Sequence, residues 1–156
     1  AQAFSSFDTY MAPYIRLDNM TYEQVKQSVQ ELIFNLNVPS RWGTQTPFTN
    51  LTFDMVCPED IRDNYPLIGG EVCDFSYGDL QREMDMINKA YMEVMTAGDD
   101  NGRVFTFPIP TYNITKDFDW DSENTNLLFE MTAKYGLPYF QNFINSELDP
   151  GMIRSM

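Results

Sequence analysis

Histidine is absent from the chain, and only two of its 156 residues are cysteine. Because histidine is the commonest general base and the commonest zinc ligand, Ser-His-Asp, Cys-His and His-metal sites are excluded within this polypeptide. The sequence also lacks the P-loop pattern Gly-x-x-x-x-Gly-Lys-Ser/Thr and the dinucleotide pattern Gly-x-Gly-x-x-Gly. The usual sequence signatures of hydrolases, zinc enzymes and nucleotide-binding folds are therefore missing.

The two cysteines, Cys57 and Cys73, are too few for a disulfide framework. Neither lies in a Cys-x-x-Cys motif or beside a run of cations that would lower its thiol pKa. A single Cys57–Cys73 bridge is compatible with the sequence, but a cytosolic location favours thiols. We predict no chemical role for either residue.

Basic side chains are scarce, with 10 against 23 acidic ones and a net charge of -13. This charge repels nucleic acids and anionic membranes, so neither is an expected partner. No stretch approaches the roughly 20 apolar residues of a membrane span, and the first residues carry no signal core, so we expect a soluble, cytoplasmic protein. A nucleoside triphosphate remains compatible, because helix N-termini and a few local cations hold phosphate even within acidic proteins.

Apolar and aromatic residues, by contrast, are abundant, at 43% and 15% of the chain. The composition is that of a globular protein. Twelve Phe, nine Tyr and ten Met are many for one small unit to bury, so we expect a slice of a larger fold. The alternative is a non-catalytic, acidic α/β interaction module that complements another polypeptide.

Helical periodicity of apolar residues predicts four helices, at about 4–11, 22–35, 79–95 and from 121 or 122 to 136. Thr21 and Gln24 form a capping-box signature at the start of the second helix. Gly136 is placed to stop the fourth.

Three strands are predicted, at about 50–55, 104–109 and 139–144, and the stretch 57–74 is predicted to be a loop with little regular structure. Helices separate the strands by far more than a hairpin turn. The predicted fold class is therefore α/β, with a parallel, buried sheet or barrel wall.

An acidic run precedes the last helix, with Asp117, Asp119, Asp121 and Glu123 at alternate positions. The run lacks the spaced glycine and terminal glutamate of a calcium loop. We interpret it as an N-cap with favourable helix-dipole charge, and we predict no metal ligands in the chain.

The segment 40–50 is the best local candidate for ligand contact, because it joins a helix to a strand and combines a cation, an indole and neutral hydrogen-bonding groups. Its candidate residues are Arg41, Trp42, Gly43, Gln45, Thr46, Thr49 and Asn50. Spacing alone favours the simpler interpretation, a polar turn with Trp42 packed in the core.

Two long segments resemble the catalytic barrel of anaerobic (class III, glycyl-radical) ribonucleotide reductases. They are SRWGTQTPFTNLTFD at 40–54 and RVFTFPIPTYNITKDFDWDSENTNLLFEMTAKYGLPYFQNFINSELDPGMIRSM at 103–156. The opening AQAFSSFDTYMAPYI is similar to the dimer and effector helices of that family. The resemblance covers essentially the whole chain and implies part of a ten-stranded α/β barrel, incomplete here.

The resemblance also implies an oxidoreductase that makes deoxyribonucleoside triphosphates by glycyl and thiyl radical chemistry. It implies formate as reductant, ATP and deoxynucleotide effectors, a structural zinc, a homodimer, and an iron-sulfur activase that uses S-adenosylmethionine. In the family, the two active-site cysteines lie upstream of Ala1 and just downstream of the segment resembling DPGMIRSM. We therefore expect no catalytic residue and no cofactor in this chain, and no activity without the remaining segments of the reductase.

The resemblance divides the chain into dimer and effector-side helices at 1–37, a specificity loop and strand at 38–56, and barrel helices and strands up to the finger loop at 57–156. It also reverses the interpretation of 40–50, which becomes a substrate and effector contact. Strand ends surround the substrate in this barrel, so Thr111, Asn113 and Asn142 are predicted pocket residues. Because the chain stops at Met156, before the expected cysteine, we hypothesise an intein or a gene split there.

Overall fold

The computed structural model describes residues 2–39, 46–136, 138–144 and 147, and its centre is a four-stranded sheet. The strands are β1 (Gln2–Phe4), β2 (Thr49–Phe53), β5 (Ile109–Ile114) and β6 (Tyr139–Asn142). Their order is β1-β2-β5-β6, and every neighbouring pair is parallel. The predicted parallel α/β class is confirmed.

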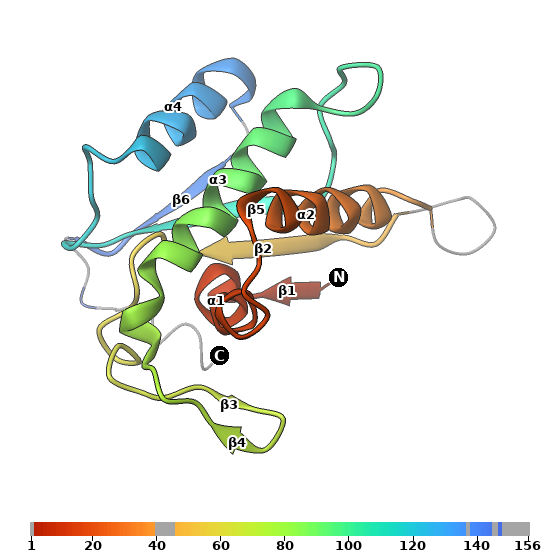
Figure 1. The fold of residues 1–156 in the computed structure, drawn as a ribbon. Coiled ribbons are helices and arrows are strands. Elements are labelled where there is room, and N and C mark those ends of the chain that lie inside the picture. The colour runs from red at the N-terminus through yellow and green to blue at the C-terminus, as the bar shows by residue number, and fades with distance from the viewer. Residues whose placement is uncertain (1, 40–45, 137, 145–146, 148–156) are drawn as a thin grey trace.

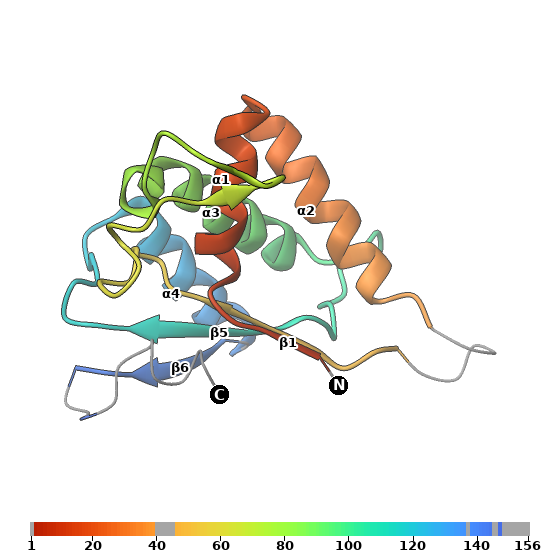
Figure 2. The same ribbon diagram turned by 90° about the horizontal axis from the view of Figure 1, so that it is seen from below.

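The helices of the described chain lie together on one side of this sheet (Figures 1 and 2). They are α1 (Phe7–Leu17), α2 (Tyr22–Leu36), α3 (Gln81–Ala97) and α4 (Glu123–Tyr135). A single-turn 3-10 helix, η1 (Tyr77–Leu80), precedes α3. With all crossovers on one face, the sheet has the arrangement of a barrel wall rather than of an open sheet covered on both faces.

Local sequence signals predicted the positions of α2 and α4 well. Thr21 caps α2 as predicted: its Oγ1 accepts from the Gln24 backbone N–H at 3.3 Å, and the Gln24 side chain accepts from the Thr21 N–H at 3.0 Å. Ser122 caps α4 by accepting from the Thr125 N–H, and Gly136 ends it with a φ of 62°. These signals act within one turn of helix, so they need no tertiary information.

The prediction for the first helix was wrong at both ends. The helix begins at Phe7, after a short strand at 2–4, and it continues through Pro13 to Leu17. Proline has a φ suited to a helix and loses only one N–H donor. The apolar face that includes Ala12 and Ile15 is buried in the core, and this burial outweighs the missing hydrogen bond.

The predicted strand at 104–109 was also wrong, because the strand that forms is β5, at 109–114. Its bounds are set by pairing with β2 and β6, from Asn50↔Ile109 to Ile114↔Asn142. The stretch 57–74, predicted to have little regular structure, contains a small antiparallel hairpin of β3 (Leu67–Ile68) and β4 (Glu71–Val72). Gly69 and Gly70 form its two-residue turn, both with positive φ.

The core lies between the sheet and the helices. Phe53 of β2 stacks on Tyr112 of β5, with centroids 5.2 Å apart, and packs on Tyr91 of α3 at 4.6 Å. All three side chains are fully buried. This aromatic cluster fixes which face of β2 and β5 points to the helices.

Candidate functional site

The sheet face opposite the helices is lined by polar side chains. Side chains alternate along a strand, so the residues next to Phe53 and Tyr112 point away from the core. The registers place Asn50 beside Ala3 and pair Thr111 with Tyr139 and Asn113 with Gln141. We call Asn50, Thr52, Thr111, Asn113, Tyr139 and Gln141 the open face, because the described helices lie on the other side of the sheet (Figures 1 and 2).

Two of the predicted site residues meet on the open face. The Asn50 amide, on β2, donates from Nδ2 to Thr111 Oγ1 of β5 at 3.2 Å. Thr52 Oγ1 donates to Asn50 Oδ1 at 3.5 Å. Asn113 lies two residues beyond Thr111 on the same face, and both are buried. Neutral donors and acceptors are thus collected along two neighbouring strands.

The other predicted site residues lie elsewhere. Thr49 is buried on the helix side of β2, where its Oγ1 donates to the Pro47 carbonyl at 3.4 Å. Asn142 pairs with Ile114, which puts it on the helix-side face, and it accepts from the Ile144 N–H. Thr46 is half-buried, three residues before β2. Arg41, Trp42, Gly43 and Gln45 lie outside the described residues.

A buried polar network adjoins Asn113 at the carboxyl end of β2. Asp54 accepts from Asn113 Nδ2 through Oδ1 and from Thr9 Oγ1 through Oδ2, both at 2.8 Å. Asp8, on the first turn of α1, accepts from four N–H donors at 2.9–3.0 Å. These donors are the backbone N–H groups of Thr9, Asp54 and Met55 and the side-chain amide of Asn88.

Sequence reasoning missed Asp8, Thr9, Asp54 and Asn88. Asp54 is a charged residue between Phe53 and Met55 in the predicted strand, yet it is only 3% exposed. The structure leaves it buried because the chain turns at Met55, whose φ of 65° ends β2 and presents two backbone N–H groups to Asp8. No local pattern marks that turn, since positive φ is rare outside glycine.

The pKa of Asp8 in this buried network is unusually high for a carboxyl group. Burial and the neighbouring Asp54 carboxylate raise the pKa of Asp8 to about 7, against the lowering effect of its N–H donors. Two carboxyl groups close together in a buried site disfavour double ionisation. The amide donors provide the compensation that such a site requires.

Three buried acceptor or hydroxyl atoms have no hydrogen-bond partner among the described residues: Asn88 Oδ1, Asn113 Oδ1 and the Tyr112 hydroxyl. Buried polar atoms normally have hydrogen-bond partners, so an unpaired one can indicate a position where a ligand or water binds. Asn113 differs from the other two because it belongs to the open face. Its amide nitrogen donates to Asp54 Oδ1, and its buried oxygen accepts no hydrogen bond from the described residues.

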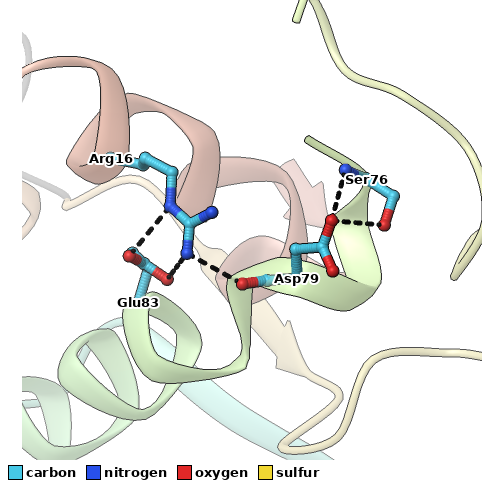
Figure 3. Close-up of polar contacts among 4 residues, drawn as sticks. All are labelled: Arg16, Ser76, Asp79 and Glu83. Atoms are coloured by element: carbon cyan, nitrogen blue, oxygen red, sulfur yellow. Dashed lines mark hydrogen bonds and ion pairs between the residues drawn. The ribbon is translucent and has the colours of Figure 1, made fainter. Parts of the chain in front are cut away.

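Helix α1, which carries Asp8 and Thr9, is held against α3 by Arg16 (Figure 3). The guanidinium donates from Nε to Glu83 Oε1 at 3.2 Å and from Nη2 to the Asp79 carbonyl at 2.9 Å. The Asp79 carboxylate in turn accepts from the backbone and hydroxyl of Ser76, both at 3.1 Å. These contacts fix the far end of α1.

A pocket of about 270 Å³ opens at the carboxyl ends of the strands, between Met55, Asp85, Asp117 and the start of α4. Burial raises the pKa of Asp85. The cap of α4 is Ser122 rather than one of the acidic residues, while Glu123 lies in the first turn of the helix, as the helix-dipole interpretation expects. Asp119 Oδ1 accepts from the Asp121 N–H. Within the described ranges, no group of three or more His, Cys, Asp or Glu side chains is placed to hold a metal.

Cys57 is buried and Cys73 is half-buried, and in the described structure they form no disulfide. Across the same residues, no helix is long and apolar enough to cross a membrane.

A parallel sheet with helices on one face and a polar opposite face defines a segment of α/β barrel wall. The chain belongs to the family described as anaerobic ribonucleoside-triphosphate reductase, whose model matches residues 1–156. The resemblance predicted from the sequence is confirmed. No curated protein matches the chain at a significant level.

Solved structures agree with this fold. An anaerobic ribonucleotide reductase from Thermotoga maritima with MES in the active site matches with a TM-score of 0.67 and 19% identity, over 94% of this chain and 26% of that one. The same reductase in complex with dATP and CTP matches with a TM-score of 0.63, 19% identity and the same coverage. Another anaerobic ribonucleotide reductase gives 0.63 and 20%, over 91% and 23%. The chain spans about a quarter of the length of these reductases.

Proposed function

We propose that the protein is part of an anaerobic reductase that converts ribonucleoside triphosphates to deoxyribonucleoside triphosphates. The family match over residues 1–156 carries this proposal. In the proposal, this segment supplies barrel wall and nucleotide contacts, and it has no activity without the remaining segments. A non-catalytic interaction module is less favoured, because the family match covers the whole chain.

The open face supports a nucleotide as the ligand. Asn50, Thr111 and Asn113 offer neutral hydrogen-bonding groups suited to ribose hydroxyls and base edges. Asn113 Oδ1 is a buried acceptor with no partner among the described residues, as expected of a group that a ligand completes. One related reductase is described in complex with dATP and CTP. We propose nucleotide contacts for Arg41, Trp42, Gly43, Gln45 and Thr46 on the family resemblance alone. Thr49 and Asn142 are not included, because they lie on the helix side of the sheet.

The cofactors of the proposed reductase would be held outside this segment. A chain with two cysteines and no histidine does not fit a zinc site of the cysteine or histidine type. The glycyl radical, formate, effectors and an S-adenosylmethionine activase are proposed for the complete enzyme, together with a cytoplasmic location. No step of the chemistry is assigned to the described residues.

A homodimer is proposed for the complete enzyme, and α1 supports it. Tyr10, Met11, Tyr14 and Leu17 are all exposed on that helix, although they are large and apolar. Contiguous exposed apolar side chains mark protein interaction surfaces. We call these four residues the α1 stripe.

The test is ribonucleotide reduction by the complete, activated protein under anaerobic conditions. Thr111→Val keeps the shape of the side chain and removes its hydroxyl from the open face. We expect kcat/KM for the ribonucleotide to fall about tenfold, because a buried polar contact to the ligand is left incomplete. Asn126→Ala is the matched control, since Asn126 is exposed on α4.

Failure of the wild-type protein to reduce any ribonucleotide would refute the proposed function. If kcat/KM falls equally in Thr111→Val and Asn126→Ala, the open face does not contact the nucleotide.

A further inference from the structure

The buried network connects α1 to the open face through one carboxylate. Asp54 Oδ2 receives the hydroxyl of Thr9 on α1, and Asp54 Oδ1 receives the amide of Asn113 on β5. Both bonds are 2.8 Å long. Asp54 is therefore a direct bridge between a helix and an open-face side chain that the sequence separates widely.

The position of this bridge is set by Asp8. It accepts the backbone N–H groups of both Asp54 and Met55, and it also binds the Asn88 amide of α3. The first turn of α1 thus fixes the backbone on which the Asp54 carboxylate is mounted. All of these side chains are buried, where rotamers are held by packing.

The bridge orients the Asn113 amide. A carboxylate accepts hydrogen bonds, so the side of the amide facing Asp54 must be the nitrogen, and the oxygen is turned away from it. That oxygen has no partner among the described residues. If the amide were free to rotate, its nitrogen and oxygen would exchange places and the open face would present a donor instead of an acceptor.

We propose that Asp54, held by Thr9 of α1, is a positioning residue that keeps Asn113 Oδ1 presented as an acceptor on the open face. The ligand group it selects is a hydroxyl or N–H donor of the nucleotide. This inference rests on the proposed function. It assigns Thr9 and Asp54 a role in substrate affinity, although neither touches the substrate.

Two substitutions at Thr9 separate positioning from packing, both made in the complete reductase. Thr9→Val keeps the side-chain volume and removes the hydroxyl that holds Asp54. Thr9→Ser keeps the hydroxyl and removes a methyl group. We expect Thr9→Val to raise KM for the ribonucleotide about fivefold, the scale of one hydrogen bond, and Thr9→Ser to stay within about twofold of wild type.

A double-mutant cycle with Asn113→Ala shows whether the effect passes through Asn113. When the amide is absent, Thr9→Val should change KM by less than about twofold. Asp54→Asn, measured in both backgrounds, gives the same comparison if Thr9→Val does not fold. Nucleotide affinity from equilibrium titration should follow the same pattern as KM.

Equal effects of Thr9→Val with and without Asn113 would overturn the positioning role. So would equal effects of Thr9→Val and Thr9→Ser, or a loss of stability with KM unchanged. A wild-type enzyme that reduces no ribonucleotide would refute the proposed function, whereas an active wild type with an additive cycle refutes this inference alone.

Discussion

The residues that define the candidate site are neutral amides and hydroxyls supported by buried carboxylates. Asn50 was predicted as part of the polar segment 40–50, and Thr111 and Asn113 were predicted because the family resemblance places strand ends around the substrate. Asp8 and Asp54 were not predicted, because their burial depends on a helix and a strand end meeting. At this scale the sequence named three of the six side chains of the open face, but not the groups that hold them.

The raised pKa of Asp8 predicts an unusual dependence of stability on pH. Its folded pKa of about 7 lies above the ordinary value of 3.8, so between about pH 4 and 7 the folded protein binds more protons than the unfolded one. The free energy of unfolding should therefore fall as pH rises through this range, by up to about 4 kcal/mol, and should level off above pH 7.

Urea unfolding at pH 5, 6, 7 and 8 would measure this effect. In Asp8→Asn the free energy of unfolding should not fall as pH rises from 5 to 7, whatever the absolute stability of that variant. Asp63→Asn, an exposed change of the same formal charge, serves as the control and should keep the wild-type slope. Identical slopes in wild type and Asp8→Asn would show that Asp8 does not titrate in this range.

At the scale of elements, α1 is the piece on which the site depends. Its first turn supplies Asp8 and Thr9, and its last turn supplies Arg16. The Arg16 guanidinium binds Glu83, whose side chain is only 8% exposed. It also lies 5.2 Å from the centre of the Phe75 ring. Both ends of α1 are thus tied to different parts of the fold.

Arg16→Met should destabilise the protein by about 1–3 kcal/mol, because it leaves Glu83 buried without its ion-pair partner. Lys26→Met is the matched control, since the Glu93 partner of Lys26 is 28% exposed and remains hydrated. Its cost should be about 0–1 kcal/mol. Chemical denaturation of both variants gives the comparison, and equal losses would mean that burial of Glu83 does not set the cost.

The elements also show where sequence patterns succeed. α2 and α4 were placed to within a few residues because caps and apolar periodicity are local. β5 was misplaced because the apolar residues from Val104 to Ile109 also fit a strand, and only the pairing with β2 and β6 selects 109–114. β1 has three residues and no pattern of its own.

For the whole molecule, the described sheet has two edges, β1 and β6. Unpaired strand edges invite pairing with further strands, as a barrel wall requires. The exposed α1 stripe lies on the helical layer instead. The chain therefore has two kinds of surface for further polypeptide: strand edges that extend the barrel and an apolar helix suited to a second copy.

Met11→Glu should weaken the proposed homodimer of the complete reductase at least about tenfold, because it places a charge in an apolar contact. Val72→Glu, on the exposed β4 strand of the hairpin, is the control and should leave association unchanged. Sedimentation velocity over a range of concentrations measures both. If Met11→Glu associates as strongly as the wild type, α1 is not part of the dimer contact.

The sequence by itself determined the character of the helices, the parallel α/β class, the family and the absence of a histidine-based site. These features depend on residue types and on patterns a few residues long. Only the tertiary structure decided which sheet face is polar and open, where β5 begins, and that Asp8 and Asp54 meet beside Asn113. The bonds concerned join residues 46 and 59 positions apart, and such contacts exist only when the packed helices and paired strands bring those positions together.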